Sequence, residues 1–352
     1  MNYNVWNKWD PLKTVVLGTT YHPDFYKDIK NTRIRSCLQR IAKETLEDLA
    51  GFERVLNNFG CTVLRTKVDP DDSIMNYISN EGKFIGERNG VPKAPLEPRN
   101  CQFVGGNKLY ITLSEPDVQQ TLIDYNSKDI IDLRTGDWRN VHGPNFTVLG
   151  KDIYVDQFDC KLLDWQIESL HANFPDLRLN LLNIGGHNDA VFAPIGPGRI
   201  LSLKEIQHYK DTFPNWEVCY LPNQSWQKVA KFAKLLDKNM GKWWLPGEEE
   251  NDEFTHFVET WLHDWVGYVE ETVFDVNCLV LDEHHVCVSQ KDNPIVNDFF
   301  AKHNIKTVYV PWRHRYFWDG GLHCITLDLE REGTQQDLFP ERTHPVQDRG
   351  FE

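Results

Sequence analysis

The sequence lacks long apolar runs, basic clusters and a signal core. No stretch approaches the about 18 uncharged apolar residues of a membrane-spanning helix, and the N-terminus, MNYNVWNKWD, has no apolar segment typical of a signal peptide. Lys and Arg number 38 against 52 Asp and Glu, which gives a formal net charge of −14. Such a surface repels polyanions. We therefore predict a protein that binds neither membranes nor nucleic acid.

Closely spaced cysteine pairs are also missing. Zinc sites usually show such a pair, and secreted disulfide scaffolds are shorter and denser in cysteine. We interpret most of the cysteines as buried free thiols in a reducing compartment and expect a cytoplasmic location. The eight cysteines are residues 37, 61, 101, 160, 219, 278, 287 and 324.

Short β-rich runs and amphipathic helical patterns are present throughout the 352 residues. Hydrophobic residues make up 40% of the chain, enough for a large core, and we expect one catalytic domain over residues 1–352. The patterns predict strands over 14–18, 61–65, 108–113, 152–155, 178–182, 199–203, 216–221, 278–281, 285–289, 307–310 and 324–329. They predict helices over 44–59, 159–173, 227–234 and 293–304.

The region 278–310 indicates how these elements are ordered. Residues 278–281 and 285–289 flank Asp282-Glu283-His284 and predict a β-hairpin, which a helix and a further strand follow. This order is typical of mixed α/β structure. The polar segment 241–252 is either a lid or a surface loop anchored by its tryptophans. We expect the polar tail, about 334–352, to wrap the surface or fray.

Two glycine-rich segments carry candidate chemistry. Gly320 and Gly321 precede Cys324, so the backbone can turn sharply there and a substrate can approach closely. In a strand His323 would point away from Cys324, so we look for the general base elsewhere, and His187 is the best placed. A cysteine with a distant histidine is typical of nucleophilic catalysis. From the pattern alone, such a cysteine and such a histidine are more often structural than catalytic.

The resemblance to a known family decides between these interpretations. The chain resembles the amidinotransferases, close to the glycine amidinotransferases, within the guanidino-group-modifying (pentein) superfamily. The matches run in the same order along the chain, from residue 9 to residue 333. They are Trp9-Asp10-Pro11-Leu12 with Val15-Val16-Leu17-Gly18, Pro98-Arg99-Asn100, Asn145-Phe146 with Gly150-Lys151-Asp152-Ile153, His187-Asn188-Asp189-Ala190 with Ile195-Gly196-Pro197-Gly198, Leu281-Asp282-Glu283, and Gly320-Gly321-Leu322-His323-Cys324.

This resemblance implies a five-bladed, pseudosymmetric α/β propeller, the pentein fold, around an acidic substrate channel. It implies that Cys324 attacks the guanidino carbon of an arginine-like donor and that His187 moves the protons. It implies no metal and no organic cofactor. The partners that it implies are small guanidino or amine molecules. A homodimer is compatible with the sequence, which does not set the oligomeric state. The remaining expected site residues are Asn145 for catalysis and Gly186, Asp189, Asn100, His323, Glu270 and Glu271 for substrate binding.

Asn100 and Asn145 depart from the family, which carries aspartates there. An asparagine offers a carbonyl acceptor but no charge, so two interpretations follow. Either the donor is a neutral urea-like or amide-like group, or amidino transfer is retained and other acids supply the charge. A third interpretation is a scaffold without activity. Glu270 and Glu271 stand where glycine amidinotransferases carry serines, which indicates a different acceptor or donor end.

Three functions therefore compete. The first is transfer of an amidino group from arginine or a related donor to a small amine. The second is hydrolysis of a guanidino or urea-like substrate through the same thiol intermediate, as in a deiminase or dihydrolase. The third is binding of a small polar metabolite without catalysis.

Overall fold

One order of elements recurs along the chain: an antiparallel hairpin, a helix, and a third strand parallel to the second strand of the hairpin. The structure is a computed structural model, and it describes residues 2–79, 81–86, 90–135, 141–157, 162–184, 186–203, 209–221, 244–248, 251–266 and 273–348. Within these residues the strands form five separate sheets, four of three strands and one of four.

Four consecutive units follow this order. The first is β3 (Gln102–Gly105), β4 (Lys108–Ile111), α2 (Pro116–Tyr125) and β5 (Ile130–Asp132). The second is β6 (Phe146–Leu149), β7 (Asp152–Asp156), α3 (Asp164–Asn173) and β8 (Arg178–Leu182). The third is β9 (Phe192–Gly196), β10 (Arg199–Ser202), α5 (Tyr209–Thr212) and β11 (Glu217–Tyr220). The fourth is β12 (Leu279–Asp282), β13 (His285–Val288), α9 (Pro294–Lys302) and β14 (Lys306–Tyr309).

Both ends of the chain build the fifth unit. β15 (Thr326–Arg331) pairs antiparallel with β1 (Leu12–Leu17), and β1 continues through α1 (Thr32–Asn58) to β2 (Thr62–Arg65), which lies parallel to it. The fifth sheet therefore has the same order as the others, although its first strand comes from the far end of the sequence. β16 (Val346–Asp348) adds a fourth strand to the sheet of the second unit, parallel to β8.

Further helical elements lie within or between these units. They are η1 (Pro23–Tyr26), η2 (Ile74–Asn76), η3 (Leu133–Thr135), η4 (Gly143–Asn145), α4 (Asn188–Val191), α7 (Asp252–Trp261), α8 (Val273–Val276) and α10 (Arg315–Trp318). Among the described helices, none is both long enough and apolar enough to cross a membrane.

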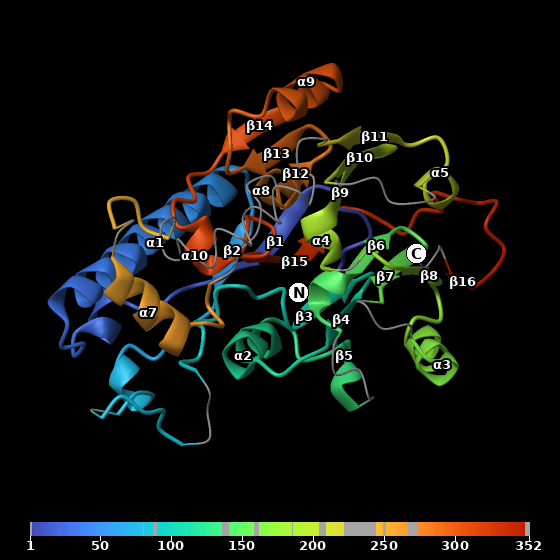
Figure 1. The fold of residues 1–352 in the computed structure, drawn as a ribbon. Coiled ribbons are helices and arrows are strands. Elements are labelled where there is room, and N and C mark those ends of the chain that lie inside the picture. Colours follow the sequence, from blue (N-terminus) through green and yellow to red (C-terminus); the bar gives the residue numbers. More distant parts are fainter. Residues whose placement is uncertain are drawn as a thin grey trace.

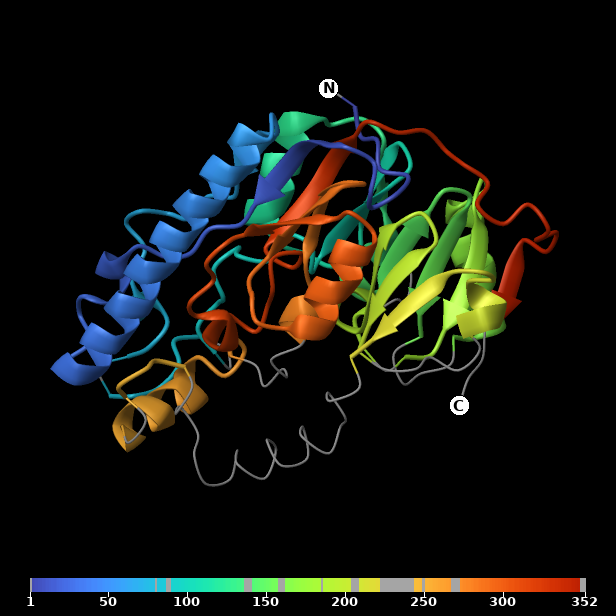
Figure 2. The same cartoon turned by 90° about the horizontal axis from the view of Figure 1, so that it is seen from above.

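The helices that connect second and third strands lie on the outside of the molecule. Figure 1 shows α1, α2, α3, α5 and α9 at the periphery, with β1, β15 and α4 nearer the middle, and Figure 2 shows α1 running along one side. Asn31 caps α1, where its side chain accepts from the backbone N–H groups of Arg33 and Ile34. Apolar residues recur at three- and four-residue spacing along the inner face of α1. These residues are buried: Ile34, Leu38, Ile41, Leu49, Phe52 and Leu56.

The sequence predicts much of this arrangement. Every predicted strand has a counterpart in the structure within a few residues, the hairpin of β12 and β13 is confirmed, and so is the mixed α/β class. Helices α1, α3 and α9 match predictions, with α1 starting earlier than predicted, whereas the predicted helix 227–234 lies outside the described residues. Each sheet is open. The strand predicted over 324–329 begins at Thr326 instead, so Cys324 lies in a turn before it.

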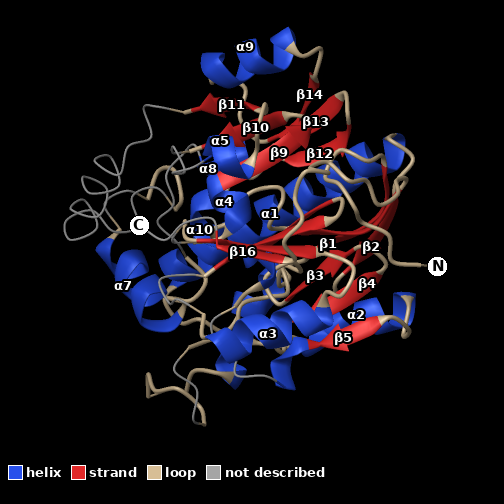
Figure 3. Cartoon of the chain, turned by 90° about the vertical axis from the view of Figure 1, so that its right-hand side faces the viewer, coloured by secondary structure: helices blue, strands red, loops and turns tan. Residues whose placement is uncertain are grey.

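Two expectations about loops have specific outcomes. In the segment 241–252, Trp244 is fully buried, and Pro246 accepts a hydrogen bond from Arg40 of α1, so this described part is anchored to the core. The tail does not simply fray, because β16 joins a sheet and the carbonyls of Phe339 and Arg342 accept from Arg178. Figure 3 shows β16 among the strands.

A buried carboxylate ties several units together. Asp328 of β15 accepts hydrogen bonds from Arg99 at 2.9 Å and from Arg331 at 2.8 Å, and all three side chains are almost fully buried. Burial alone would raise the pKa of Asp328, but the charges of Arg331, Arg99 and Lys8 outweigh it and hold that pKa well below its ordinary value. The resulting stability is present above the ordinary aspartate pKa and is lost as the pH falls through the lowered one.

We predict that Asp328→Asn lowers the free energy of unfolding by about 3–5 kcal/mol, because two buried guanidinium groups lose their counter-charge. Urea unfolding of both proteins at neutral pH measures the difference. Asp71→Asn, at an exposed position, is the matched control and should change little. Equal unfolding midpoints for Asp328→Asn and the wild-type chain would contradict this account.

Candidate active site

A tight turn presents Cys324 just before β15. Asn277, which follows α8, accepts hydrogen bonds through Oδ1 from the backbone N–H groups of His323 and Cys324, both at 3.0 Å. Its Nδ2 donates to the sulfur of Cys324 at 3.0 Å and to the carbonyl of Asp189 at 3.2 Å. One amide side chain therefore fixes both the backbone and the thiol of the candidate nucleophile.

The glycines before Cys324 are required by close neighbours. A Cβ on Gly321 would lie 2.8 Å from the backbone oxygen of Asn277, and a Cβ on Gly320 would lie 2.7 Å from Oε1 of Glu97. Asp319, immediately before them, has a left-handed backbone conformation with φ of 56°. The sharp turn that the sequence predicts is therefore present, and it brings Asn277 and Glu97 next to Cys324.

His323 lies closer to the nucleophile than the sequence suggests. The expectation that it points away from Cys324 assumed a strand, but both residues lie in the turn. His323 Nδ1 is 2.7 Å from Asp189 Oδ2, and the sulfur of Cys324 donates to the same oxygen at 3.6 Å. Asp189, from α4, is thus shared between the two neighbouring residues of the turn.

Asp189 is ionised and His323 is neutral. Burial opposes the charge on Asp189, but the hydrogen bond from His323 and the charge of Arg99 outweigh it and hold the pKa of Asp189 below its ordinary value. Burial, with the charges of Arg99 and Lys8, lowers the pKa of His323 to about 3. At neutral pH the carboxylate of Asp189 therefore lies beside an uncharged imidazole of the turn.

Two carboxylates oppose ionisation of Cys324. Burial raises the pKa of the thiol well above its ordinary value, and the charges of Asp189 and Glu97 raise it further, while the hydrogen bond from Asn277 acts in the other direction. Without a substrate, the balance of these groups favours the neutral thiol, and an added cation would favour the thiolate.

Glu97 and Asn100 line a cleft of about 700 Å³. Glu97 accepts from Asn100 Nδ2 at 2.5 Å and from Lys93 Nζ at 3.0 Å, and its side chain is only 8% exposed. Lys93 also donates to the carbonyl of Trp318. The sequence singled out Asn100 for its missing charge, and the structure places a carboxylate directly beside it.

His187 and Asp189 lie in the same segment of the chain, at the start of α4. The backbone of His187 precedes α4, and its ring centroid is 5.3 Å from that of His142, a residue that lines the same cleft. The charge of His187 favours ionisation of Asp189, whereas no hydrogen bond joins His187 to Cys324. The structure places His187 beside His142, which lines the cleft, rather than in contact with the sulfur. Catalytic hydrogen bonds often form only with a substrate in place.

Asn145 and Gly186 form a different set of contacts. Asn145 is fully buried; its Oδ1 accepts from the backbone N–H of His142 at 2.9 Å and its Nδ2 donates to the carbonyl of Gly186 at 3.3 Å. The N–H of Gly186 donates to Asp156. Because a carboxylate cannot donate to a carbonyl, an asparagine suits this position better than an aspartate. Its amide connects the loop at η4 to the segment that carries His187.

Glu270 and Glu271 lie outside the described residues. No group of three or more potential metal ligands occurs in the part of the chain that the structure describes. Sequence reasoning missed Asn277 and Glu97. Glu97 directly precedes the motif Pro98-Arg99-Asn100, and Asn277 lies between α8 and the motif Leu281-Asp282-Glu283. Their spacing from Cys324 gives no signal, since the contacts depend on the fold.

Comparison with known proteins bears on this site. No family model matches the chain. It is 26% identical to the mitochondrial glycine amidinotransferase of Xenopus laevis over 202 residues, 55% of this chain and 39% of the relative. It is 22% identical to the L-arginine:L-lysine amidinotransferase of Pseudomonas savastanoi pv. phaseolicola over 195 residues, 54% of this chain and 44% of that one. The matches thus span about two fifths of the length of these relatives.

Solved structures match over nearly the whole chain. An amidinotransferase of the saxitoxin biosynthetic pathway from Microseira wollei has a TM-score of 0.65 at 18% identity and covers 96% of this chain and 99% of its own. A dimethylarginine dimethylaminohydrolase has a TM-score of 0.53 at 10% identity, covering 90% and 99%. The sequence and fold comparisons together confirm the resemblance to the amidinotransferases. The fold alone is also shared with a hydrolase.

We predict that Asn277→Ala raises the apparent pKa of Cys324 by about one unit or more, because a hydrogen bond to a charged group contributes about 1.5–3 kcal/mol and one pKa unit corresponds to about 1.4 kcal/mol. The measurement is the pH dependence of alkylation of Cys324 by iodoacetamide, followed by peptide mass spectrometry. Asn31→Ala removes the cap of α1, which is distant from Cys324 in the sequence. It controls for a general loss of stability. An unchanged titration curve would show that Asn277 does not act on the sulfur.

Proposed function

From its similarity in sequence and fold to the amidinotransferases, we propose that this chain moves an amidino group from a guanidino donor to an amine through a covalent intermediate on Cys324. The observation that carries the proposal is the thiol itself. It is held by Asn277 in a turn between two carboxylates, Asp189 and Glu97, and Glu97 lines an open cleft.

We further propose that residues 1–352 form one catalytic domain, a five-bladed α/β propeller. Five sheets with one strand order support this arrangement, and the pairing of β15 with β1 would join the last unit to the first. The peripheral helices in Figure 1 are consistent with blades around a common axis. All seven described cysteines are free, which supports the cytoplasmic location that we propose.

In the first half-reaction the thiolate of Cys324 attacks the guanidino carbon of the donor. The carbon–nitrogen bond to the rest of the donor breaks, and the departing amine takes a proton from His187. An amidino group is then bound to the sulfur. In the second half-reaction the nitrogen of the acceptor amine attacks the amidino carbon and gives a proton to His187. The carbon–sulfur bond breaks and the thiolate is restored.

The charge balance explains why a guanidinium suits this site. Without a substrate, Asp189 and Glu97 oppose ionisation of the Cys324 thiol. A bound guanidinium would neutralise their negative charge and favour the thiolate. Of the two interpretations of Asn100 and Asn145, this favours retained amidino transfer, with Glu97 supplying the charge beside Asn100. Asn145 keeps a positioning role through Gly186 and His142.

Hydrolysis is the second candidate, because the fold is shared with a dimethylarginine dimethylaminohydrolase. Both reactions pass through a thiol adduct, but different groups leave and attack. In transfer the amine that bears the rest of the donor leaves and an acceptor amine attacks the adduct, whereas in hydrolysis to citrulline ammonia leaves first and water attacks the adduct. A protein that only binds a metabolite would form no adduct.

We predict that incubation with arginine gives an amidino adduct on Cys324 by intact mass, and that an added small amine yields ornithine and a guanidino product. Citrulline and ammonia would instead establish hydrolysis. Cys324→Ala should abolish adduct and turnover, and His187→Ala should slow turnover by about 10²–10⁴-fold, as expected for loss of a general acid–base. Cys219→Ala, at a free cysteine outside the site, should behave as wild type. A folded Cys324→Ala variant that retains turnover would exclude this mechanism.

We predict that Glu97→Gln raises KM for a guanidinium donor about 10–100-fold, because a charged hydrogen bond contributes about 1.5–3 kcal/mol. A neutral urea-like donor should not lose affinity, since glutamine keeps the acceptor oxygen. Steady-state kinetics with both donor classes provide the measurement. The matched control is Glu53→Gln, because Glu53 of α1 also pairs with a cation, Arg65 of β2. Equal losses for charged and neutral donors would assign Glu97 a structural role instead.

A further inference from the structure

A lysine from the start of the chain connects to the candidate nucleophile through two buried side chains. Lys8 Nζ lies 3.0 Å from His323 Nε2, and His323 Nδ1 lies 2.7 Å from Asp189 Oδ2. The same oxygen of Asp189 accepts from the sulfur of Cys324 at 3.6 Å. The four groups form one continuous hydrogen-bonded series, and its members come from three separate parts of the sequence.

The partners in this series assign the protons on His323. An ammonium group can only donate, so Nε2 of His323 carries the lone pair and Nδ1 carries the proton. That proton is donated to Asp189 Oδ2. If Nε2 were protonated instead, a lone pair on Nδ1 would face the carboxylate, which is unfavourable.

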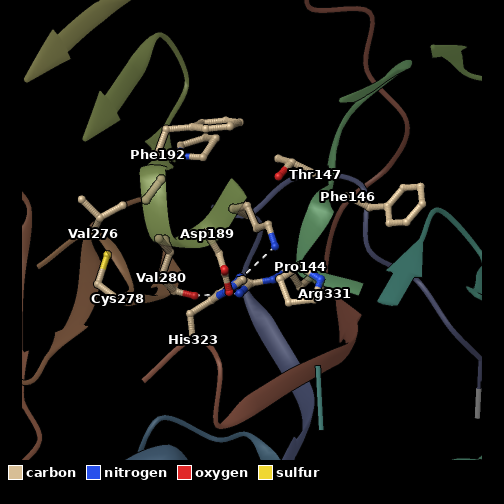
Figure 4. A pocket seen from close by; sticks show the side chains of 13 residues that line it. Pro144, Phe146, Thr147, Asp189, Phe192, Val276, Cys278, Val280, His323 and Arg331 are labelled. Atoms are coloured by element: carbon tan, nitrogen blue, oxygen red, sulfur yellow. Dashed lines mark hydrogen bonds and ion pairs between the residues drawn. The ribbon is translucent and has the colours of Figure 1, made fainter. Parts of the chain in front are cut away.

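The environment of the series makes its charges effective. Lys8, Asp189, His323 and Arg331 line a small cavity of about 20 Å³, whose other walls include apolar side chains such as Val276. Figure 4 shows Asp189 extending from α4 toward His323, with Arg331 close by and Val276 and Val280 on one side. In surroundings so poor in water, charges a few ångströms apart interact more strongly than at the surface.

We propose that Lys8 is a positioning residue for the nucleophile: its ammonium group holds His323 in one tautomer, His323 orients the carboxylate of Asp189, and Asp189 Oδ2 in turn fixes the thiol of Cys324. This inference rests on the proposed function only in taking Cys324 as the nucleophile. The hydrogen-bonded series itself is independent of the substrate.

Other charged groups also face Lys8. Arg99 and Arg331 disfavour its charge, whereas Asp328 and Asp189 favour it, and burial together with the two arginines lowers the pKa of Lys8 to about 7. The ammonium charge is therefore complete below that pH and lost above it. When it is lost, less positive charge offsets Asp189, and the pKa of Cys324 should rise. Cys324 is itself faced by Asp189 and by Glu97, which is paired with Lys93.

The test compares the full chain with Lys8→Met and Lys8→Arg. The readout is the rate at which iodoacetamide alkylates Cys324 as a function of pH, measured by peptide mass spectrometry without any substrate. Methionine keeps the length of the side chain and removes the charge, and arginine keeps the charge. We expect Lys8→Met to raise the apparent pKa of Cys324 by about one unit, which is about a tenfold slower reaction at neutral pH. Lys8→Arg should restore most of the rate.

Two further variants make the result specific. Lys13→Met, at an exposed lysine of β1 paired with Glu332, should match the wild-type profile. In a His323→Gln background the series is interrupted, so adding Lys8→Met should change little, as a double-mutant cycle will show. Fully additive effects, or a wild-type profile for folded Lys8→Met, would overturn the proposal. Because alkylation requires no turnover, a chain that shows this coupling but forms no amidino adduct would refute only the proposed function.

Discussion

The buried carboxylate of Asp328 is the interaction on which the rest of the site depends. Its two oxygens are divided between Arg99 and Arg331. An arginine presents several N–H groups in one plane, so each guanidinium can hold further partners in fixed directions. These two donate to four backbone carbonyls, those of Asp10, Val280, His323 and Thr326. One ion cluster therefore fixes β15, β12, the N-terminal segment and the turn of Cys324 relative to one another.

The sequence predicts the second and third strands of the units better than the first ones. β4, β7, β10 and β13 show clear β-rich runs, whereas the first strands β3, β6 and β9 were missed, as was the third strand β5. β3 and β6 are buried at every position, so they have no alternation of apolar and polar residues. β9 contains Pro194, which argues against a strand by itself. These strands are specified by their neighbours, and a window of sequence does not contain that information.

The site shows the same division between local and long-range information. Cys324, His187 and Asp189 belong to motifs with unusual glycines, so a resemblance can locate them. Asn277 and Lys8 look ordinary in sequence, and their roles arise only because folding brings them within hydrogen-bond distance of the turn. His323 shows the opposite failure. Alternation along a strand would separate it from Cys324, but the residue lies in a turn, where that rule does not apply.

The charges around the sulfur of Cys324 explain why asparagines suit positions 100 and 145. Asp189 and Glu97 already oppose the thiolate, and aspartates at positions 100 and 145 would add more negative charge to this part of the chain. Among the lysines that the structure describes, Lys93 is paired with Glu97, and Lys8 contacts His323 rather than the sulfur. Under the proposed mechanism, the cation that stabilises the thiolate must then come from the donor itself. A neutral molecule in the cleft would leave the thiol protonated, so the requirement for charge selects the substrate at the same step that activates the nucleophile.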